Sequence, residues 1–232
     1  MSSFSLNVTT FYYPTKIIFG PGAIERLPLE IEAFRMLRPL VVTDGGLAKS
    51  PVFDRVLGII RKRSGDAVVF DQVLPNPTER NVLEGVARYQ EGKCDGVIGV
   101  GGGSPLDAAK AITLKATHPL PLADYDDLKD GSDRISSNVP PFLAVPTTSG
   151  TGSDVSRSSV ITLTATNRKT VIFSPFLMPK VSVSDPELTL GMVNNSNATS
   201  REVREAIDTI CEWMTWSVWR NRKFSPLSAL RS

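Results

Sequence analysis

Histidine and cysteine are scarce in this sequence of 232 residues, which contains one histidine, His118, and two cysteines, Cys94 and Cys211. The cysteines lie far apart and form no C-x-x-C pattern, so we expect reduced thiols and neither a disulfide framework nor a thiolate zinc site. Long apolar runs are also missing, since stretches such as residues 39–42 and 97–100 fall far short of the roughly 18 residues that a membrane span needs. A membrane partner is therefore not expected.

Two further signals are missing: a secretory leader and an excess of one charge. No basic stretch followed by an apolar one opens the sequence, so we expect a cytoplasmic protein. The 26 basic residues nearly balance the 24 acidic ones, and residues 1–191 carry 20 of each sign. Phosphate backbones are bound by concentrated lysine and arginine, and this neutral composition argues against a nucleic-acid partner.

A change in composition marks a boundary at residue 191. Residues 192–232 hold all three tryptophans and none of the 17 glycines, so we predict a domain over 1–191 and a divergent tail over 192–232. Thr199 and Glu202 have capping-box spacing, which predicts one amphipathic helix in the tail. Its apolar face would hold Val203, Ile207, Ile210, Met214 and Val218. Packing against the domain is the more typical use of such a face than a membrane or partner surface.

Strands and helices alternate through most of the domain. The sequence predicts short β-branched strands over residues 16–19, 40–43, 67–70, 96–100 and 142–145. It predicts helices over residues 51–63, 78–90 and 104–117. This alternation implies parallel pairing with right-handed crossovers, and the predicted fold class is α/β with a doubly wound, mostly parallel sheet. Residues 160–184 are rich in Thr, Val and Ser and predict extra strands or a hairpin.

The most informative motif is a glycine triplet, Gly101 to Gly103, between a strand and a helix. Glycines let a phosphate approach the backbone, and the start of the helix offers free N–H groups. We expect Ser104 at the N-cap, Pro105 at the first helical position and Asp107 at the third. A tight turn without a ligand is the alternative, but the position after a parallel strand favours phosphate binding. The motif is neither G-x-G-x-x-G nor a P-loop.

Two other loops follow predicted strands. Asp44 precedes Gly45 and Gly46, and its carboxylate could accept hydrogen bonds from a ribose or simply form an Asp-Gly-Gly turn; the residues alone favour the turn. The loop of residues 146–154, PTTSGTGSD, is rich in hydroxyl groups that would either bind a ligand or satisfy their own backbone. Its expected place at the same sheet edge as the glycine loop favours the ligand.

Several motifs together resemble the iron-dependent alcohol dehydrogenases. In chain order they are FYYPTKIIFGPGAIERL, PLVVTDGGL, PNPT at residues 75–78, CDGVIGVGGGSPLDAAKAI, PTTSGTGSD and DPELTL at residues 185–190. The resemblance implies a Rossmann-like, dehydroquinate-synthase-like domain that binds NAD(P), an all-helical domain that holds a divalent metal, and hydride transfer between an alcohol or aldehyde and nicotinamide. It covers residues 11–191 and is therefore limited to the cofactor-binding half.

The resemblance also implies cofactor-binding residues. Gly101, Gly102, Gly103, Ser104 and Asp107 would bind the pyrophosphate and a nearby ribose; Thr147, Thr148 and Ser149 would lie on the adenosine and nicotinamide side; Asp44 would bind the adenosine ribose. Lys169 matches a family lysine near the cofactor, although a solvated lysine beside a strand is an alternative. The negative charge of Asp44 would repel a 2′-phosphate, so we expect NAD rather than NADP.

The sequence departs from the family in two places. Asp154 stands where the family usually has Glu, which keeps the carboxylate. After residue 190 the chain lacks the expected segment that begins a metal site of one Asp and three His. We therefore expect Fe²⁺ or Zn²⁺ for the family but assign no metal ligand and no catalytic residue to this chain. His118 is expected in a solvated loop, and a solvated acidic turn is favoured over a cation site for Asp124, Asp126 and Asp127.

Several interpretations stay open at this point. Within enzymes, a metal-independent relative resembling the maleylacetate reductases is the main alternative. A non-catalytic nucleotide-binding module is the alternative from another class. A truncated or frame-shifted gene, or a chain that needs a partner, would explain the divergent tail, and a homo-oligomer is an open alternative.

Overall fold

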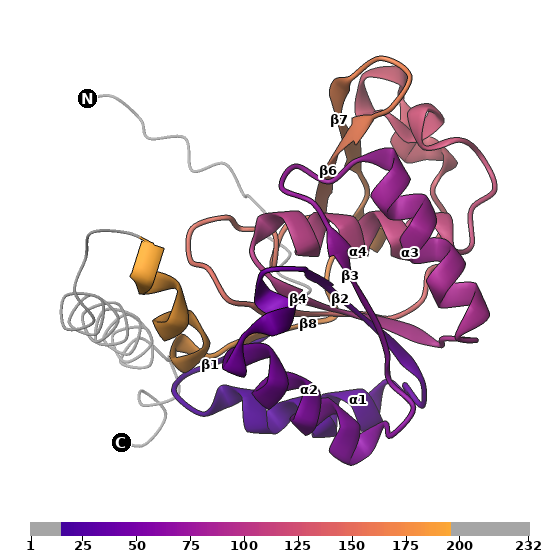
Figure 1. The fold of residues 1–232 in the computed structure, drawn as a ribbon. Helices are drawn as coiled ribbons and strands as arrows, with labels where there is room; N and C mark the ends of the chain where they lie inside the picture. The colour runs from indigo at the N-terminus through magenta and orange to yellow at the C-terminus, as the bar shows by residue number, and fades with distance from the viewer. Residues whose placement is uncertain (1–14, 196–232) are drawn as a thin grey trace, which may run out of the picture.

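The main sheet has six strands. The structure is a computed structural model that describes residues 15–195, and its strands lie in the order β1-β8-β5-β4-β2-β3 with every adjacent pair parallel (Figure 1). They are β1 (Lys16–Phe19), β2 (Pro39–Asp44), β3 (Val68–Val73), β4 (Gly96–Gly101), β5 (Phe142–Pro146) and β8 (Val181–Ser184). The predicted α/β fold with a parallel sheet is confirmed.

Helices cover both faces of this sheet. The first pair is α1 (Leu27–Ala33) and α2 (Pro51–Arg63), and the second is α3 (Glu79–Glu91) and α4 (Gly103–Lys115), on the opposite face (Figure 1). Neighbouring side chains along a strand point to opposite faces, so Val41 lies in the core under α1 and α2 while Val42 lies in the core under α3 and α4. Both side chains are fully buried.

Side-chain caps determine where two of the helices begin. Ser50 Oγ accepts a hydrogen bond from the Phe53 N–H at 3.2 Å, and proline occupies the first turn of α2. Thr78 and Asn81 form a capping box at the start of α3. The helix starts predicted at residues 51 and 78 therefore agree with the structure to within one residue.

The sheet has a topological switch point between β2 and β4. From β2 the chain continues through α2 to β3 on one side, and then crosses through α3 to β4 on the other side of β2. The helices that follow β2 and β4, α2 and α4, consequently lie on opposite faces of the sheet. Doubly wound folds bind ligands at such a switch point.

A separate hairpin lies on the face that carries α3 and α4 (Figure 1). Its antiparallel strands are β6 (Ser158–Leu163) and β7 (Arg168–Phe173), so the hairpin, one of the two alternatives predicted for residues 160–184, is present. The Thr162 N–H donates to the Pro77 carbonyl at 2.8 Å, which joins β6 to the loop before α3. The 3-10 segments are η1 (Ala23–Arg26), η2 (Leu47–Lys49), η3 (Leu122–Tyr125), η4 (Asp127–Lys129), η5 (Gly131–Arg134), η6 (Pro175–Leu177) and η7 (Pro186–Asn195).

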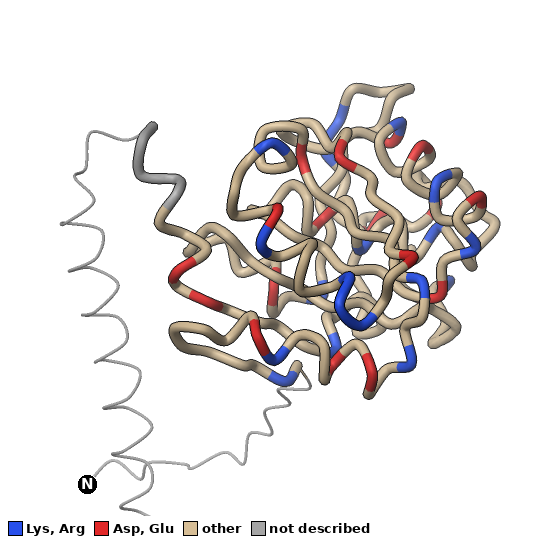
Figure 2. The backbone as a smooth tube through the Cα atoms, turned by 60° about the horizontal axis from the view of Figure 1, so that its bottom comes forward, with Lys and Arg blue, Asp and Glu red and all other residues tan. Residues whose placement is uncertain are grey.

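The boundary predicted at residue 191 falls within η7, and the predicted tail helix lies outside the described residues. Basic and acidic positions alternate along the described backbone rather than forming a continuous stripe of one sign in this view (Figure 2). Within residues 15–195, none of the helices combines the length and the apolar character that crossing a membrane requires.

Candidate functional site

The glycine loop joins β4 to α4. Gly101 has a φ angle of 142°, and a Cβ at this position would lie 2.8 Å from Cγ of Pro105, so the loop requires glycine here. The expectation that Ser104 caps the helix is wrong, because Gly102 is the N-cap and its carbonyl already accepts the Leu106 N–H. No side chain among residues 15–195 caps the helix start. This arrangement suits a bound anion.

The hydroxyl-rich loop after β5 lies against the glycine loop. The Thr147 N–H donates to the Gly101 carbonyl at 3.0 Å, and a Cβ on Gly102 would lie 3.1 Å from Thr148 Oγ1. Thr148 Oγ1 is buried and has no hydrogen-bond partner among the described residues. A buried hydroxyl without a partner is destabilising, so a ligand that bonded to it would recover free energy. Ser149 is exposed at the tip of the same loop.

The loop after β2 forms the turn that the residues alone favoured. Asp44 Oδ1 accepts hydrogen bonds from the N–H groups of Gly46 and Leu47, both at 2.9 Å. This loop adjoins the glycine loop, since a Cβ on Gly101 would lie 3.5 Å from Cδ2 of Leu47. The Asp44 carboxylate is half-buried at the switch point. Forming the turn engages only one of its two oxygens with these amides, so the turn and a ligand contact are compatible.

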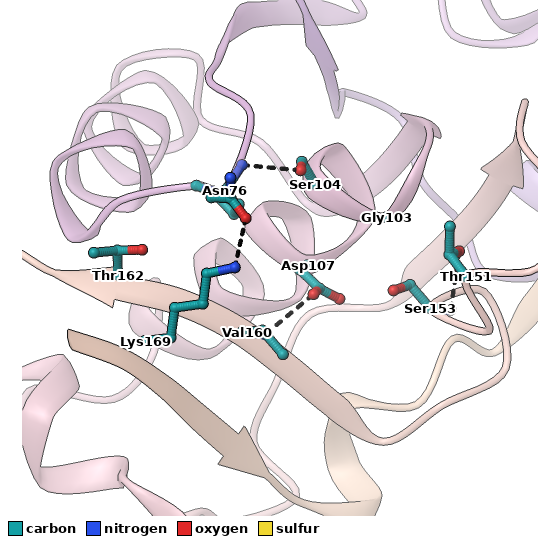
Figure 3. A pocket seen from close by; sticks show the side chains of 10 residues that line it. Asn76, Gly103, Ser104, Asp107, Thr151, Ser153, Val160, Thr162 and Lys169 are labelled. Carbon is teal, nitrogen blue, oxygen red and sulfur yellow. Dashed lines mark hydrogen bonds between the residues drawn. The ribbon is translucent and has the colours of Figure 1, made fainter.

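A cavity of about 290 Å³ lies between α4, the loop before α3 and the hairpin (Figure 3). Its lining consists of Asn76, Pro77, Gly103, Ser104, Asp107, Thr151, Ser153, Val160, Thr162 and Lys169. Four of the predicted cofactor residues therefore share one cavity: Gly103, Ser104, Asp107 and Lys169. The other six do not line it: Asp44, Gly101, Gly102, Thr147, Thr148 and Ser149. This volume is just below the range of roughly 300–1,000 Å³ that is usual for ligand pockets.

Asn76 links two of the predicted residues across this cavity, although the sequence analysis gave it no role. Its N–H donates to Ser104 Oγ at 3.2 Å, and its Oδ1 accepts from Lys169 Nζ at 2.7 Å (Figure 3). The backbone of Asn76 has a φ angle of 54°, which asparagine tolerates better than most residues. Lys169 is exposed, yet its side chain extends across the cavity toward Asn76. The sequence signal that could have identified this residue is an asparagine between two prolines, at positions 75 and 77.

Asp107 and Lys110 connect α4 to the hairpin. Asp107 Oδ2 accepts the Val160 N–H at 3.2 Å, and Lys110 Nζ lies 4.0 Å from Asp107 Oδ1. Desolvation raises the pKa of Asp107, against the opposing effects of Lys110, the Val160 N–H and the Ser153 hydroxyl. Desolvation lowers the pKa of Lys110 to about 8, although Asp107 and Asp154 both oppose this shift. Sequence reasoning missed Lys110 because a lysine on a helix is usually exposed.

Three other expectations concern residues outside the cavity. His118 is not solvated as expected: it is buried, and its Nε2 accepts the Ser136 N–H at 3.0 Å because the loop folds back over the end of α4. Asp126 is also buried, where it forms an ion pair with Arg168 of β7, so the solvated acidic turn is wrong for this residue. Burial raises the pKa of the Cys94 thiol to about 11, which keeps it protonated.

No cluster of three or more His, Cys, Asp or Glu side chains within residues 15–195 is arranged to hold a metal ion. The described residues therefore do not fit the divalent metal that the family resemblance implies, and the assignment of no metal ligand to the whole chain stays a prediction.

Comparison with known proteins gives a consistent family match. A family model described as iron-containing alcohol dehydrogenase matches residues 14–186. The chain is 44% identical over 181 residues to the 4-hydroxybutyrate dehydrogenase of Cupriavidus necator, covering 78% of this chain and 47% of that protein. It is 39% identical over 189 residues to the 1,3-propanediol dehydrogenase of Citrobacter freundii, covering 81% and 48%. The chain thus spans about half the length of these relatives.

Solved structures agree with this match. The crystal structure of a 1,3-propanediol oxidoreductase superposes with a TM-score of 0.74 at 38% identity, covering 79% of this chain and 47% of that one. A sulfoacetaldehyde reductase from Bifidobacterium kashiwanohense, solved in complex with NAD⁺, superposes with a TM-score of 0.71 at 29% identity, covering 79% and 48%. In both cases the chain covers about half of the solved structure's length.

Proposed function

Because the chain belongs to the iron-containing alcohol dehydrogenase family, we propose that its α/β domain binds a nicotinamide dinucleotide at the switch point, with NAD preferred over NADP. The pyrophosphate is assigned to the glycine loop and the start of α4. The cavity beside Ser104, Asp107 and Lys169 is assigned to the part of the cofactor that follows the pyrophosphate. Asp44 is assigned to the adenosine ribose, where its charge disfavours a 2′-phosphate.

The observation that most supports this proposal is the contact between the glycine loop and Thr148. Thr148 Oγ1 is buried without a partner, and it faces the position where Gly102 lacks a side chain. A donor without a partner beside uncapped helix N–H groups is suited to a bridging phosphate oxygen. The same loops carry Thr147, Thr151 and Ser153, whose hydroxyls supply further polar contacts.

The activity proposed for the complete enzyme is hydride transfer between a small alcohol and its aldehyde. The bound nicotinamide supplies the hydride acceptor or donor. The residues of this chain bind and orient it: the glycine loop fixes the phosphates, and Lys169 with Asn76 closes one side of the cavity. The described residues offer no metal ligand set for the alcohol, so the part of the reaction that activates the alcohol is not assigned to them.

Cofactor binding is tested by titrating the 232-residue chain with NADH and following the nicotinamide fluorescence. We expect saturable binding that NAD displaces at lower concentration than NADP. No saturation up to about 1 mM, the upper end of usual affinities for metabolic substrates, would contradict the proposal. Metal-dependent alcohol oxidation by the chain itself would exclude the alternative of a non-catalytic nucleotide-binding module.

A second test concerns metal and turnover. With one histidine in 232 residues, we expect the purified chain to retain less than one Fe²⁺ or Zn²⁺ after dialysis and to oxidise short alcohols and diols far below the rate of a full-length relative. Without a Lewis acid, the alcohol hydroxyl keeps its high pKa and hydride loss is unfavourable. Stoichiometric metal content together with robust NADH production would show that the chain contains a site not recognised in its sequence.

A further inference from the structure

Lys110 is a lysine in the interior of the domain that the proposed function has not used. Its side chain has no exposed surface, and its ammonium donates to Ser156 Oγ at 3.0 Å and to the Ser158 carbonyl at 2.8 Å. Desolvating a charge is costly unless partners compensate, and an apolar side chain would fill the same helix position without that cost. Packing alone therefore does not explain why a lysine occupies this position.

These contacts hold the hairpin against the first turns of α4. Ser156 and Ser158 lie where the hydroxyl-rich loop enters β6, and two more bonds act beside them. Ser159 Oγ donates to the Asp107 carbonyl at 2.7 Å, and the Val160 N–H donates to Asp107 Oδ2 at 3.2 Å. The hairpin supplies Val160, Thr162 and Lys169 to the cavity, so the position of β6 relative to α4 sets the width of the cavity.

The same ammonium balances negative charge beside the cavity. Asp107 lines the cavity from α4 itself, with Oδ1 at 4.0 Å from Lys110 Nζ. Asp154 approaches from the loop before β6 and is held there by Ser182 of β8, whose Oγ donates to Asp154 Oδ2 at 2.9 Å. Lys169 of β7 is bonded to Asn76 on the other side of the cavity. Without Lys110, the charges of Asp107, which lines the cavity, and of Asp154 would be less compensated when an anionic ligand binds.

We propose that Lys110 is a positioning residue for the cofactor cavity, holding β6 at its distance from α4 and offsetting the charge of Asp107 next to the bound phosphates. This inference rests on the proposed function, because it takes the cavity to be part of the cofactor site. It assigns Lys110 no direct contact with the cofactor.

A dependence on pH follows from the environment of Lys110. Burial lowers its pKa to about 8, against the charges of Asp107 and Asp154, so the ammonium loses its proton in a range where an ordinary lysine stays charged. Below this range the cation is present and both carboxylates are balanced. Above it the amine is neutral, and the affinity for NADH should fall as the pH rises through about 8.

The test compares NADH affinity between pH 6.5 and 9.5 in the full chain and three variants. We expect Lys110→Met to bind NADH about tenfold more weakly at pH 7, because the cation that offsets Asp107 beside the phosphates is lost, and to show no further step near pH 8. Lys110→Arg should keep the affinity at pH 7 and bind without the step, because arginine stays charged. Lys62→Met removes an exposed lysine on α2 and should match the unmodified chain.

Amide hydrogen exchange without cofactor gives the second readout. The Val160 and Thr162 amides should exchange several-fold faster in Lys110→Met, while those of β2 stay unchanged. Equal exchange in the hairpin, or an affinity for NADH without a step near pH 8 in the unmodified chain, would overturn the role of Lys110. Absence of NADH binding by the unmodified chain would instead overturn the proposed function, and this inference with it. Urea unfolding of each variant identifies one that fails to fold, in which case the Arg variant and the pH profile decide.

Discussion

Two glycine-containing loops leave neighbouring strands at the switch point, and they satisfy their backbones in different ways. In the loop after β2, Asp44 Oδ1 accepts the N–H groups of Gly46 and Leu47. In the loop after β4, no described side chain caps the start of α4, and the nearby hydroxyl of Thr148 has no partner among the described residues. The first loop is internally bonded, whereas the second has bonding capacity left for a ligand.

This difference teaches how to separate a turn from a binding loop. Both loops are rich in glycine and both follow buried parallel strands, so glycine content does not distinguish them. A short acid two residues before the first free N–H closes the turn locally, as at Asp44. Where no such acceptor precedes the glycines, as at Gly101 to Gly103, the helix N–H groups need a partner from outside the segment.

The largest effect is expected from a new side chain in the glycine loop after β4. Gly102→Val should lower the affinity for NADH by about 100-fold, because hydrogen bonds to a charged phosphate are worth roughly 1.5–3 kcal/mol and the new side chain keeps the phosphate away from them. Gly102 has a φ angle of −79°, which valine adopts without strain, and the nearest atom to its Cβ is Thr148 Oγ1 at 3.1 Å. Thr148 must shift slightly to admit the new side chain, and circular dichroism checks that the variant folds.

The matched control for this variant is Gly58→Ala in α2, where a new Cβ meets no atom within 4 Å. It should leave the affinity unchanged and raise the stability slightly, since alanine is favoured over glycine inside a helix by roughly 0.5–1 kcal/mol. A folded Gly102→Val protein with unchanged affinity would mean that the glycine loop is a tight turn without a ligand, and the two loops would no longer differ in function.

A smaller effect on NADH affinity is expected at the cavity beside the glycine loop. Lys169→Met should weaken NADH binding by about tenfold, because it removes the ammonium that bonds to Asn76 Oδ1 and faces the cavity. If Lys169 and Asn76 act through this one contact, the double variant Lys169→Met with Asn76→Ala should lose no more affinity than the weaker-binding single variant. Full additivity of the two losses would show that they act independently, and an unchanged affinity in Lys169→Met would return Lys169 to a solvated role.

The sheet and most helices could be predicted from the sequence because their signals are local. β-branched runs identify buried parallel strands, and the helix predicted over residues 51–63 has those bounds in the structure because Ser50 and Pro51 specify its start. The start of α4 was misplaced by this same reasoning. Ser104 and Pro105 have the residue types of a cap and a first turn, but the helix begins earlier because glycines impose no side-chain conflict and Ser104 Oγ bonds to Asn76 instead.

Which residues form the site could not be predicted in full, because contacts between distant parts of the chain bring several of them together. Lys110 is separated from Ser156 and Ser158 by 46 and 48 positions, and Asn76 from Lys169 by 93. Only the docking of the hairpin onto α4 brings them together. His118 was misjudged for a related reason, because its burial depends on Ser136 in a loop that returns 18 residues later. Long-range polar contacts of this kind have no periodic signal along the chain.

The smallest effect is expected in the loop after β2, where two substitutions separate the two roles of Asp44, in the turn and in the cofactor site. Asp44→Asn keeps a carbonyl oxygen that can accept the Gly46 and Leu47 N–H groups but removes the negative charge, so the turn and the stability should be retained while NADP affinity rises several-fold. One unit charge about 4 Å from another is worth roughly 1 kcal/mol in water, which sets this scale. Asp44→Ala also loses the acceptor and should lower the free energy of unfolding by about 1 kcal/mol, as for a lost cap. Titration with NAD and NADP and urea unfolding of both variants measure the two quantities separately. An unchanged ratio of NAD to NADP affinity in Asp44→Asn, alongside reduced stability in Asp44→Ala, would assign Asp44 to the turn alone and remove it from the cofactor site.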